Sequence, residues 1–182
     1  MAAEATSRGP AFRLSVLSHG TGPTGPASLA VSGLVESAAR YQLELKVQKG
    51  STQLVTDALG YDGTTWVRTQ GGSWQSAPAS AAPQPTSFID YAKAAQGVTD
   101  NGQVLHAGVT CEQFSANAML PAPSPGGATV PATMTAWISR ASGYLVGEMV
   151  KTTDATGAVT GTVDIELTDF GTVERVPSRP PA

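Results

Sequence analysis

Apolar and polar side chains alternate along much of this chain, most clearly between residues 40 and 74. In residues 41–47 every odd position is Tyr, Leu or Val and every even position is Gln, Glu or Lys. A period of two gives a β-strand one apolar and one polar face. Glycine-containing turns, such as Asp62-Gly63, separate the next runs, as in antiparallel hairpins. The pattern therefore predicts an antiparallel sheet with one face against a core.

The same alternation recurs on both sides of this stretch. Gly33 lies inside one run and indicates a bend or bulge in a curved sheet. Asn101-Gly102 favours a type I′ turn. Residues 110–120 fit either a helix or a strand, and we favour a strand. We expect loops at residues 20–28, 77–85 and 121–131, and about ten strands, at residues 12–17, 29–36, 40–48, 52–61, 64–70, 73–75, 103–109, 110–120, 132–139, 144–153 and 158–170.

One segment has the signals of a helix. Thr86 or Ser87 is a suitable N-cap, and Gly97 is a suitable stop. The apolar residues between them, starting with Phe88, form a stripe along one face. A helix of about three turns is marginal in water by itself. We therefore expect a mainly β (α+β) fold in which this helix covers the concave face of a curved sheet.

Composition and charge narrow the classes of function. Only 14% of the 182 residues are charged, whereas Gly (20) and Pro (13) are plentiful, which suits a turn-rich β-protein outside the cytosol. The net charge is −3 and the basic residues are scattered, so we exclude nucleic acid as a partner. The length suits one domain. We place it at residues 12–176, after a disordered or truncated segment at 1–11 and before a flexible tail at 177–182.

Cysteine content and hydropathy add two expectations. Cys111 is the one cysteine, so no disulfide can form within the chain. No apolar run approaches the roughly 20 residues of a membrane-spanning helix, and residues 1–10 lack the basic start and apolar middle of a signal peptide. We expect a chain that does not span a membrane as given. A signal or lipid anchor would belong to a longer precursor.

Candidate catalytic residues are sparse. His19 and His106 are the two histidines, and His19 lies beside a predicted surface loop. A nucleophilic pair of Cys111 with His106 would need a flanking signature that the sequence lacks, so a buried structural cysteine is the simpler interpretation. Asp164 and Glu166 lie on the same face of one strand, where a solvated polar edge is a simpler interpretation than a catalytic or metal site. We predict no catalytic residues, no metal and no cofactor.

Several strand-and-turn segments of this sequence occur in an order found in a known protein family. They are residues 41–48, Gly60–Val67 followed by Gly72–Trp74, the helix after the proline-rich loop, Thr133–Ile138, Gly143–Val146 and Ile165–Gly171. This order resembles the LolA-like group of lipoprotein carriers together with the LppX/LprG type of mycobacterial lipoproteins. The similarity covers most of residues 12–177.

The resemblance implies a strongly curved antiparallel half-barrel, with helices over its concave side and an apolar cavity for acyl chains between them. It also implies an extracytoplasmic protein that carries or holds lipids and catalyses no reaction. Two features depart from the family pattern. Residues 1–11 are too short for the amphipathic helix that usually precedes the first strand, and Cys111 lies too deep in the chain for a lipobox.

The leading hypothesis is a periplasmic, cell-envelope or secreted domain that binds or transports a lipid or acylated molecule between sheet and helix. The main rival is a structural or accessory module whose sheet docks on a partner, such as a membrane-associated protein. A hydrolase with unrecognised carboxylates or Cys111 is a third and weaker class. The candidate ligand-binding residues, for each of which ordinary core packing is the alternative, are Leu43, Leu45 and Val47 on the sheet, Phe88 and Tyr91 on the helix, and Trp137.

Overall fold

A computed structural model describes residues 9–22, 25–78, 84–85, 89–121 and 129–180 of the chain. Most of this length is β-strand, as the alternation predicts. The strands are β1 (Phe12–Gly22), β2 (Gly25–Ser37), β3 (Arg40–Lys49), β4 (Thr52–Tyr61), β5 (Thr64–Thr69), β6 (Gln75–Ala77), β7 (Ala95–His106), β8 (Val109–Leu120), β9 (Val130–Ser139), β10 (Leu145–Thr153) and β11 (Val159–Thr168).

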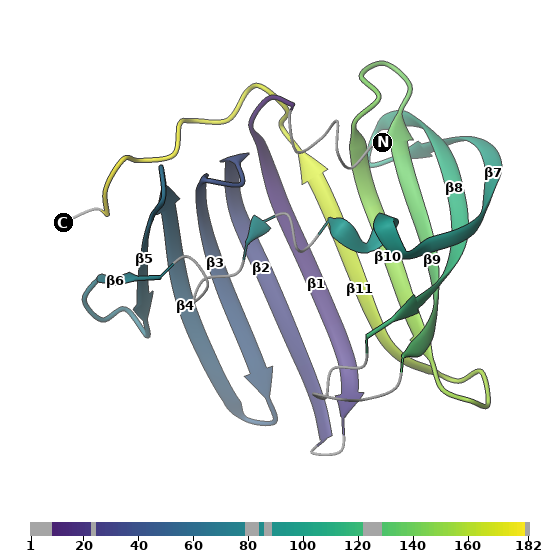
Figure 1. Cartoon of the computed structure of the whole chain (residues 1–182), viewed down its shortest axis with the longest axis horizontal. Coiled ribbons are helices and arrows are strands. Elements are labelled where there is room, and N and C mark those ends of the chain that lie inside the picture. Colours follow the sequence, from purple (N-terminus) through teal and green to yellow (C-terminus); the bar gives the residue numbers. More distant parts are fainter. Residues whose placement is uncertain (1–8, 23–24, 79–83, 86–88, 122–128, 181–182) are drawn as a thin grey trace.

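The eleven strands form one antiparallel sheet in the order β6-β5-β4-β3-β2-β1-β11-β10-β9-β8-β7. Neighbours in the sheet are neighbours in sequence except at the centre, where β1 pairs with β11 from Arg13 to Gly20. The sheet curves but does not close, so β6 and β7 remain its edges (Figure 1). The predicted open half-barrel is confirmed.

Strand β3 shows how the alternation divides the sheet into two faces. Tyr41 and Leu43 are buried, and Leu43 lies between Gly33 of β2 and Ala58 of β4. The even-numbered residues of β3 point to the opposite side, which is polar. We call the apolar side the inner face and the polar side the outer face.

Buried side chains on the inner face form two clusters. The first is centred on β1 to β4 and β11 and includes Val16 and Ile165. The second lies on β8, β9 and β10 and includes Val150. Tyr91 and Val163 pack against both clusters. The apolar interior is therefore continuous along the sheet.

The cover of the inner face is thinner than the sequence predicts. It contains η3, a 3-10 helix of five residues at Asp90–Ala94, which lies over the sheet (Figure 1). Ile89, just before it, is buried in the first cluster. The predicted helix of about three turns is thus a single 3-10 turn, and Gly97 lies within β7. Residues 86–88, where the helix was predicted to begin, lie outside the described residues.

The second half of the sheet corrects one predicted turn. Residues 101–102 do not form a hairpin turn but lie at a bulge within β7, where the pairing with β8 shifts register. The chain instead reverses at Ala107 and Gly108, which have positive φ values of 47° and 79°. Residues 110–120 form most of β8, which confirms the favoured strand.

The predicted loop at residues 20–28 is mostly strand. β1 continues to Gly22 and β2 begins at Gly25. Pro26 pairs with Thr21 of β1, but β3 joins the sheet only from Ala27 onward. Pro26 therefore faces no third strand, and its missing N–H removes no ladder hydrogen bond on that side.

Gly33 allows two strands to lie close together and does not form the bulge that the sequence suggests. It stays in register with Leu14 of β1 and Leu43 of β3. A Cβ atom at this position would lie 1.9 Å from the backbone oxygen of Gln42. Glycine is the residue that lets β2 and β3 come this close.

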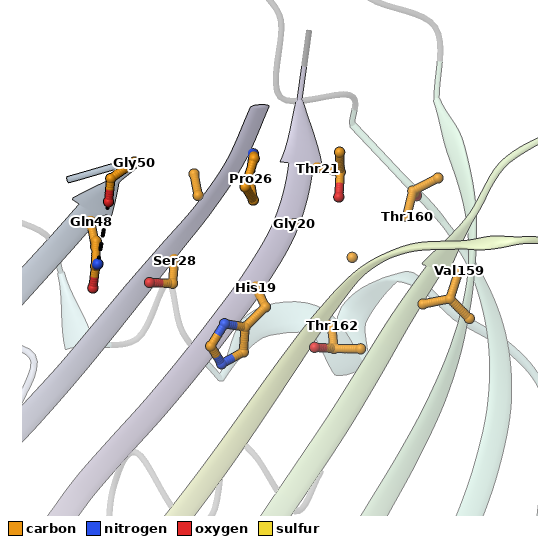
Figure 2. A pocket seen from close by; sticks show the side chains of 12 residues that line it. His19, Gly20, Thr21, Pro26, Ser28, Gln48, Gly50, Val159, Thr160 and Thr162 are labelled. Carbon is orange, nitrogen blue, oxygen red and sulfur yellow. Dashed lines mark hydrogen bonds between the residues drawn. The ribbon is translucent and has the colours of Figure 1, made fainter. Parts of the chain in front are cut away.

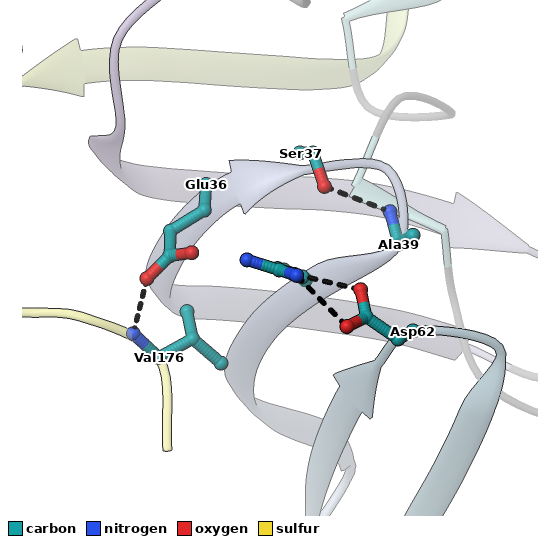
Figure 3. A network of polar contacts seen from close by, with 6 residues as sticks. Glu36, Ser37, Ala39, Asp62 and Val176 are labelled. Carbon is teal, nitrogen blue, oxygen red and sulfur yellow. Dashed lines mark hydrogen bonds and ion pairs between the residues drawn. The ribbon is translucent and has the colours of Figure 1, made fainter. Parts of the chain in front are cut away.

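The segment after β11 returns along one end of the sheet to β2 (Figures 1 and 3). Val176 is buried, and its backbone N–H donates to the Glu36 carboxylate across 2.5 Å. Nearby, Arg40 donates two hydrogen bonds of 2.7 and 2.8 Å to Asp62. These bonds lower the pKa of the Asp62 carboxyl. Polar contacts therefore tie the strand ends together at this rim.

Candidate functional site

The three candidate ligand residues of β3 lie on the inner face at increasing exposure. Leu43 is buried, and Leu45 is half-buried against the first cluster. Val47 is 42% exposed, and its partner Leu54 on β4 is 44% exposed. The apolar surface of the inner face therefore continues past the core to the hairpin end of β3 and β4.

Tyr91 is the candidate residue of the cover that the structure describes. It comes from η3 and packs against both clusters, so it lies on the same side of the sheet as Leu43 and Leu45. Burial raises the pKa of its hydroxyl, and the charge of Glu148 raises it further. Phe88, the second candidate of the cover, lies outside the described residues.

Trp137 lies on the other side of the sheet. In β9 it pairs with Gly147 of β10 and Gln113 of β8, whereas its neighbours Ala136 and Ile138 pack on the inner face. Its ring stacks on His106, with ring centroids 4.0 Å apart and planes 5° apart. Trp137 therefore belongs to an outer-face aromatic pair and does not join Leu43 and Leu45.

Glu148 of β10 is an inner-face residue that the sequence analysis did not single out. It is 1% exposed, and neither carboxylate oxygen has a hydrogen-bond partner among the described residues. In the sheet it lies between Ile165 of β11 and Ala136 of β9, both on the inner face. The sequence held a signal, because Glu148 shares its alternation with Val146 and Val150, as part of an apolar row.

Burial raises the pKa of Glu148 to about 7. The cause is desolvation, which disfavours the charged carboxylate. Glu148 therefore exchanges its proton close to neutral pH in an apolar setting. A strongly shifted carboxyl on a concave apolar face marks a candidate functional site.

A pocket with a volume of about 480 Å³ lies at the hairpin end of β1 and β2 (Figure 2). Small and polar side chains dominate its lining, and His19 is among them, as expected for a surface residue. A second pocket of about 260 Å³ is lined by Arg13, Ser15 and Glu166, among others. Neither pocket is lined by the six candidate ligand residues or by Glu148.

The geometry does not favour the Cys111–His106 nucleophile. Cys111 is fully buried, and its thiol donates to the backbone oxygen of Val109 across 3.4 Å. Burial raises the pKa of this thiol, which reduces the thiolate available for attack. Among the described residues, no three His, Cys, Asp or Glu side chains gather as a metal site. Within the same residues, no helix has the length and apolar character needed to cross a membrane.

No family model and no curated protein matches this sequence. Solved structures that share its fold include two mycobacterial proteins. LprF from Mycobacterium bovis superposes with a TM-score of 0.64 at 20% sequence identity, over 97% of this chain and 92% of LprF. The lipoprotein LppX from Mycobacterium tuberculosis superposes with a TM-score of 0.59 at 14% identity, over 97% of this chain and 94% of LppX. The resemblance to LppX/LprG-type half-barrels is confirmed at the level of the fold.

Proposed function

We propose that this chain is a non-catalytic carrier of a hydrophobic ligand, a lipid or acylated molecule, which binds on the inner face beneath the η3 cover. One observation carries the proposal. The apolar inner face extends without a break from the buried Leu43, through Leu45, to the exposed Val47 and Leu54. An apolar chain can thus reach the interior along side chains that already face solvent.

The cover favours uptake of a ligand. η3 is a single turn, and its described apolar contacts with the sheet come from few side chains, chiefly Ile89 and Tyr91. Elements with few buried contacts open at lower free energy than a core strand. Displacing the cover would therefore free inner-face surface for a ligand while the sheet stays folded.

The energetics suit exchange with a membrane. Each methylene removed from water gains about 0.8 kcal/mol. A bilayer offers nearly the same gain, so transfer between the two is close to balance. The residues that line such a site need only be apolar and adaptable, as Leu45 and Val47 are. Leu43, Phe88 and Tyr91 complete the proposed contacts.

We further propose an extracytoplasmic location, which means the periplasm, the cell envelope or the outside of the cell. The fold is shared with LppX, a lipoprotein. The low proportion of charged residues also suits this location.

Native mass spectrometry after mild purification tests the proposal. We expect the chain to carry additional mass that organic extraction identifies as lipid. Val47 is exposed, so we expect the Val47→Asp variant to fold normally. It should reduce the lipid-bound fraction several-fold, because a carboxylate then lies at the apolar entrance. Leu45→Asp should abolish the bound mass.

Leu17→Asp provides the matched control, because Leu17 is 48% exposed on the outer face. We expect its lipid-bound fraction to equal that of the unaltered chain. Circular dichroism confirms that each variant is folded. A folded chain that purifies empty and takes up no lipid from phosphatidylcholine vesicles would contradict the carrier function.

A docking module is the second candidate function, and β7 favours it. This strand is an edge of the sheet, and Val98 and Leu105 on it are 62% and 75% exposed. An unpaired edge with apolar side chains can pair with a strand of another protein. An empty chain whose binding to a membrane-associated protein is lost in Leu105→Lys would favour this alternative.

A further inference from the structure

Glu148 lacks the partners that a buried carboxylate normally has. Acidic side chains are rarely fully buried unless paired, because an unpaired buried charge costs several kcal/mol. Glu148 is 1% exposed, and no described residue donates a hydrogen bond to either of its oxygens. An unsatisfied polar group of this kind in a folded protein indicates a missing partner.

Two basic residues of β10 and of the turn after β9 do not supply that partner. Lys151 lies three residues after Glu148 on β10, so the alternation along the strand points its side chain to the outer face. There it pairs with Thr162 and Thr133. Arg140, after β9, forms an ion pair of 2.9 Å with Glu112. The fold thus places a carboxylate among apolar side chains, and no hydrogen-bond donor reaches its oxygens among the described residues.

The cross-strand register gives this carboxylate a distinct position. From Glu148, a row of inner-face residues in register crosses four further strands, so that the row spans five adjacent strands. Four strand spacings of about 4.8 Å make the row about 19 Å long, a length that suits an extended acyl chain. The row consists, in order, of Glu148 on β10, Ile165 on β11, Val16 on β1, Val31 on β2 and Leu45 on β3.

We propose that Glu148 accepts a hydrogen bond from a hydroxyl or amino group at the polar end of the ligand, an amphiphile whose chain lies along the row toward Leu45. This inference rests on the carrier function proposed above and adds the chemical class of the ligand. The donor satisfies the carboxylate that the protein leaves without a partner. Tyr91 packs over both clusters beside it and closes the site from the cover.

The proposal predicts a ranking among ligands of one chain length. Hexadecanol and hexadecylamine each bring a donor to Glu148. Methyl hexadecanoate has the same chain without a donor, and hexadecanoate brings a second negative charge. We expect the alcohol and the amine to bind at least about tenfold more tightly than the ester, and the ester more tightly than the anion.

Titration of the delipidated chain with these four ligands, followed by native mass spectrometry, tests the ranking. In Glu148→Leu the alcohol and the amine should lose their tenfold advantage, while the ester binds as well as before or better. In Glu148→Gln, which preserves the shape, the amine should lose more affinity than the alcohol, because the negative charge is gone but an acceptor oxygen remains. Glu166→Gln is the control, since Glu166 is exposed on the outer face of β11.

The outcomes separate this inference from the carrier function. If all four ligands bind equally, or if Glu148→Leu leaves the ranking unchanged, the anchor role of Glu148 is wrong although the chain still binds lipids. If none of the four ligands binds to the folded chain, both the anchor role and the carrier function are wrong.

Discussion

A carboxylate taken out of water loses hydration free energy unless hydrogen-bond donors or a cation replace the lost water. No described residue donates a hydrogen bond to Glu148, and burial removes its water, so folding favours the protonated carboxyl over the carboxylate. The phenol of Tyr91 on η3 interacts with it electrostatically. Its sheet neighbours are Ile165 and Ala136. Glu148 therefore links the stability of the fold to pH.

The sign of this linkage is opposite to that of a salt-bridged acid. The pKa of Glu148 rises from an ordinary 4.5 to about 7 on folding, so the folded state binds the proton more strongly than the unfolded state. Stability is then highest below the unfolded pKa and falls as the pH rises through the folded pKa. At about 1.4 kcal/mol per pKa unit, Glu148 lowers the free energy of unfolding by about 3 kcal/mol above neutral pH.

Glu148→Gln should remove this dependence. We expect urea denaturation to show the variant more stable than the unaltered chain by about 3 kcal/mol at pH 8, and nearly equal to it at pH 4.5. Glu166→Gln, on the outer face, should follow the unaltered chain at both pH values. If the free energy of unfolding of Glu148→Gln falls between pH 4.5 and pH 8 as much as that of the unaltered chain, other groups cause the pH dependence.

At the scale of the elements, the packing around β3 depends on close approach of neighbouring residues. Gly33 brings β2 against the backbone of Gln42 on β3. Gly60 on β4 allows Tyr41 to lie over it, because a Cβ atom there would be 2.4 Å from Cε1 of the tyrosine ring. Tyr41 is 1% exposed and is among the largest buried side chains. Two glycines thus shape the inner face around β3.

Gly33→Ala should destabilise the fold by about 3 kcal/mol or more, because the added methyl group meets a backbone oxygen that cannot move without breaking the β2–β3 pairing. Gly20→Ala is the control. At Gly20 the nearest atom to a Cβ lies 3.7 Å away, so we expect a change below about 0.5 kcal/mol. Thermal unfolding of both variants measures the difference. Similar melting temperatures would contradict the close-approach role of Gly33.

At the scale of the whole molecule, one sheet carries both clusters, and Tyr91 and Val163 contact each of them. The pairing of β1 with β11 joins the first six strands to the last five. Separate unfolding of the halves would expose this shared interior. We therefore expect the chain to unfold as one cooperative unit, as small single domains usually do.

Substitutions in the two clusters test this cooperativity. Ile165→Ala in the first cluster and Met134→Ala in the second should each lower the free energy of unfolding by about 2–5 kcal/mol. Far-UV circular dichroism and tryptophan fluorescence should report one common transition for both variants. Leu105→Ala, at a highly exposed position, should leave the transition unchanged. Separate transitions for the two probes would show that the clusters unfold independently.

The predicted and observed structures agree where the signal is local. The alternation at residues 41–47 placed Tyr41 and Leu43 in the core and their even-numbered neighbours outside. The favoured strand at residues 110–120 also holds. The helix prediction overestimated its length, because the burial of Ile89 and Tyr91 against the sheet shapes this segment more than helix propensity does.

The sequence alone determined an antiparallel, turn-rich sheet with an apolar face, since side-chain direction alternates along each strand whatever lies beside it. Tertiary structure decided which residues share that face. Trp137 lies outside and Glu148 inside because of the register of β9, β10 and β11, together with a bulge near the start of β10. Register across distant strands depends on long-range pairing, β1 with β11 above all, which no local pattern encodes.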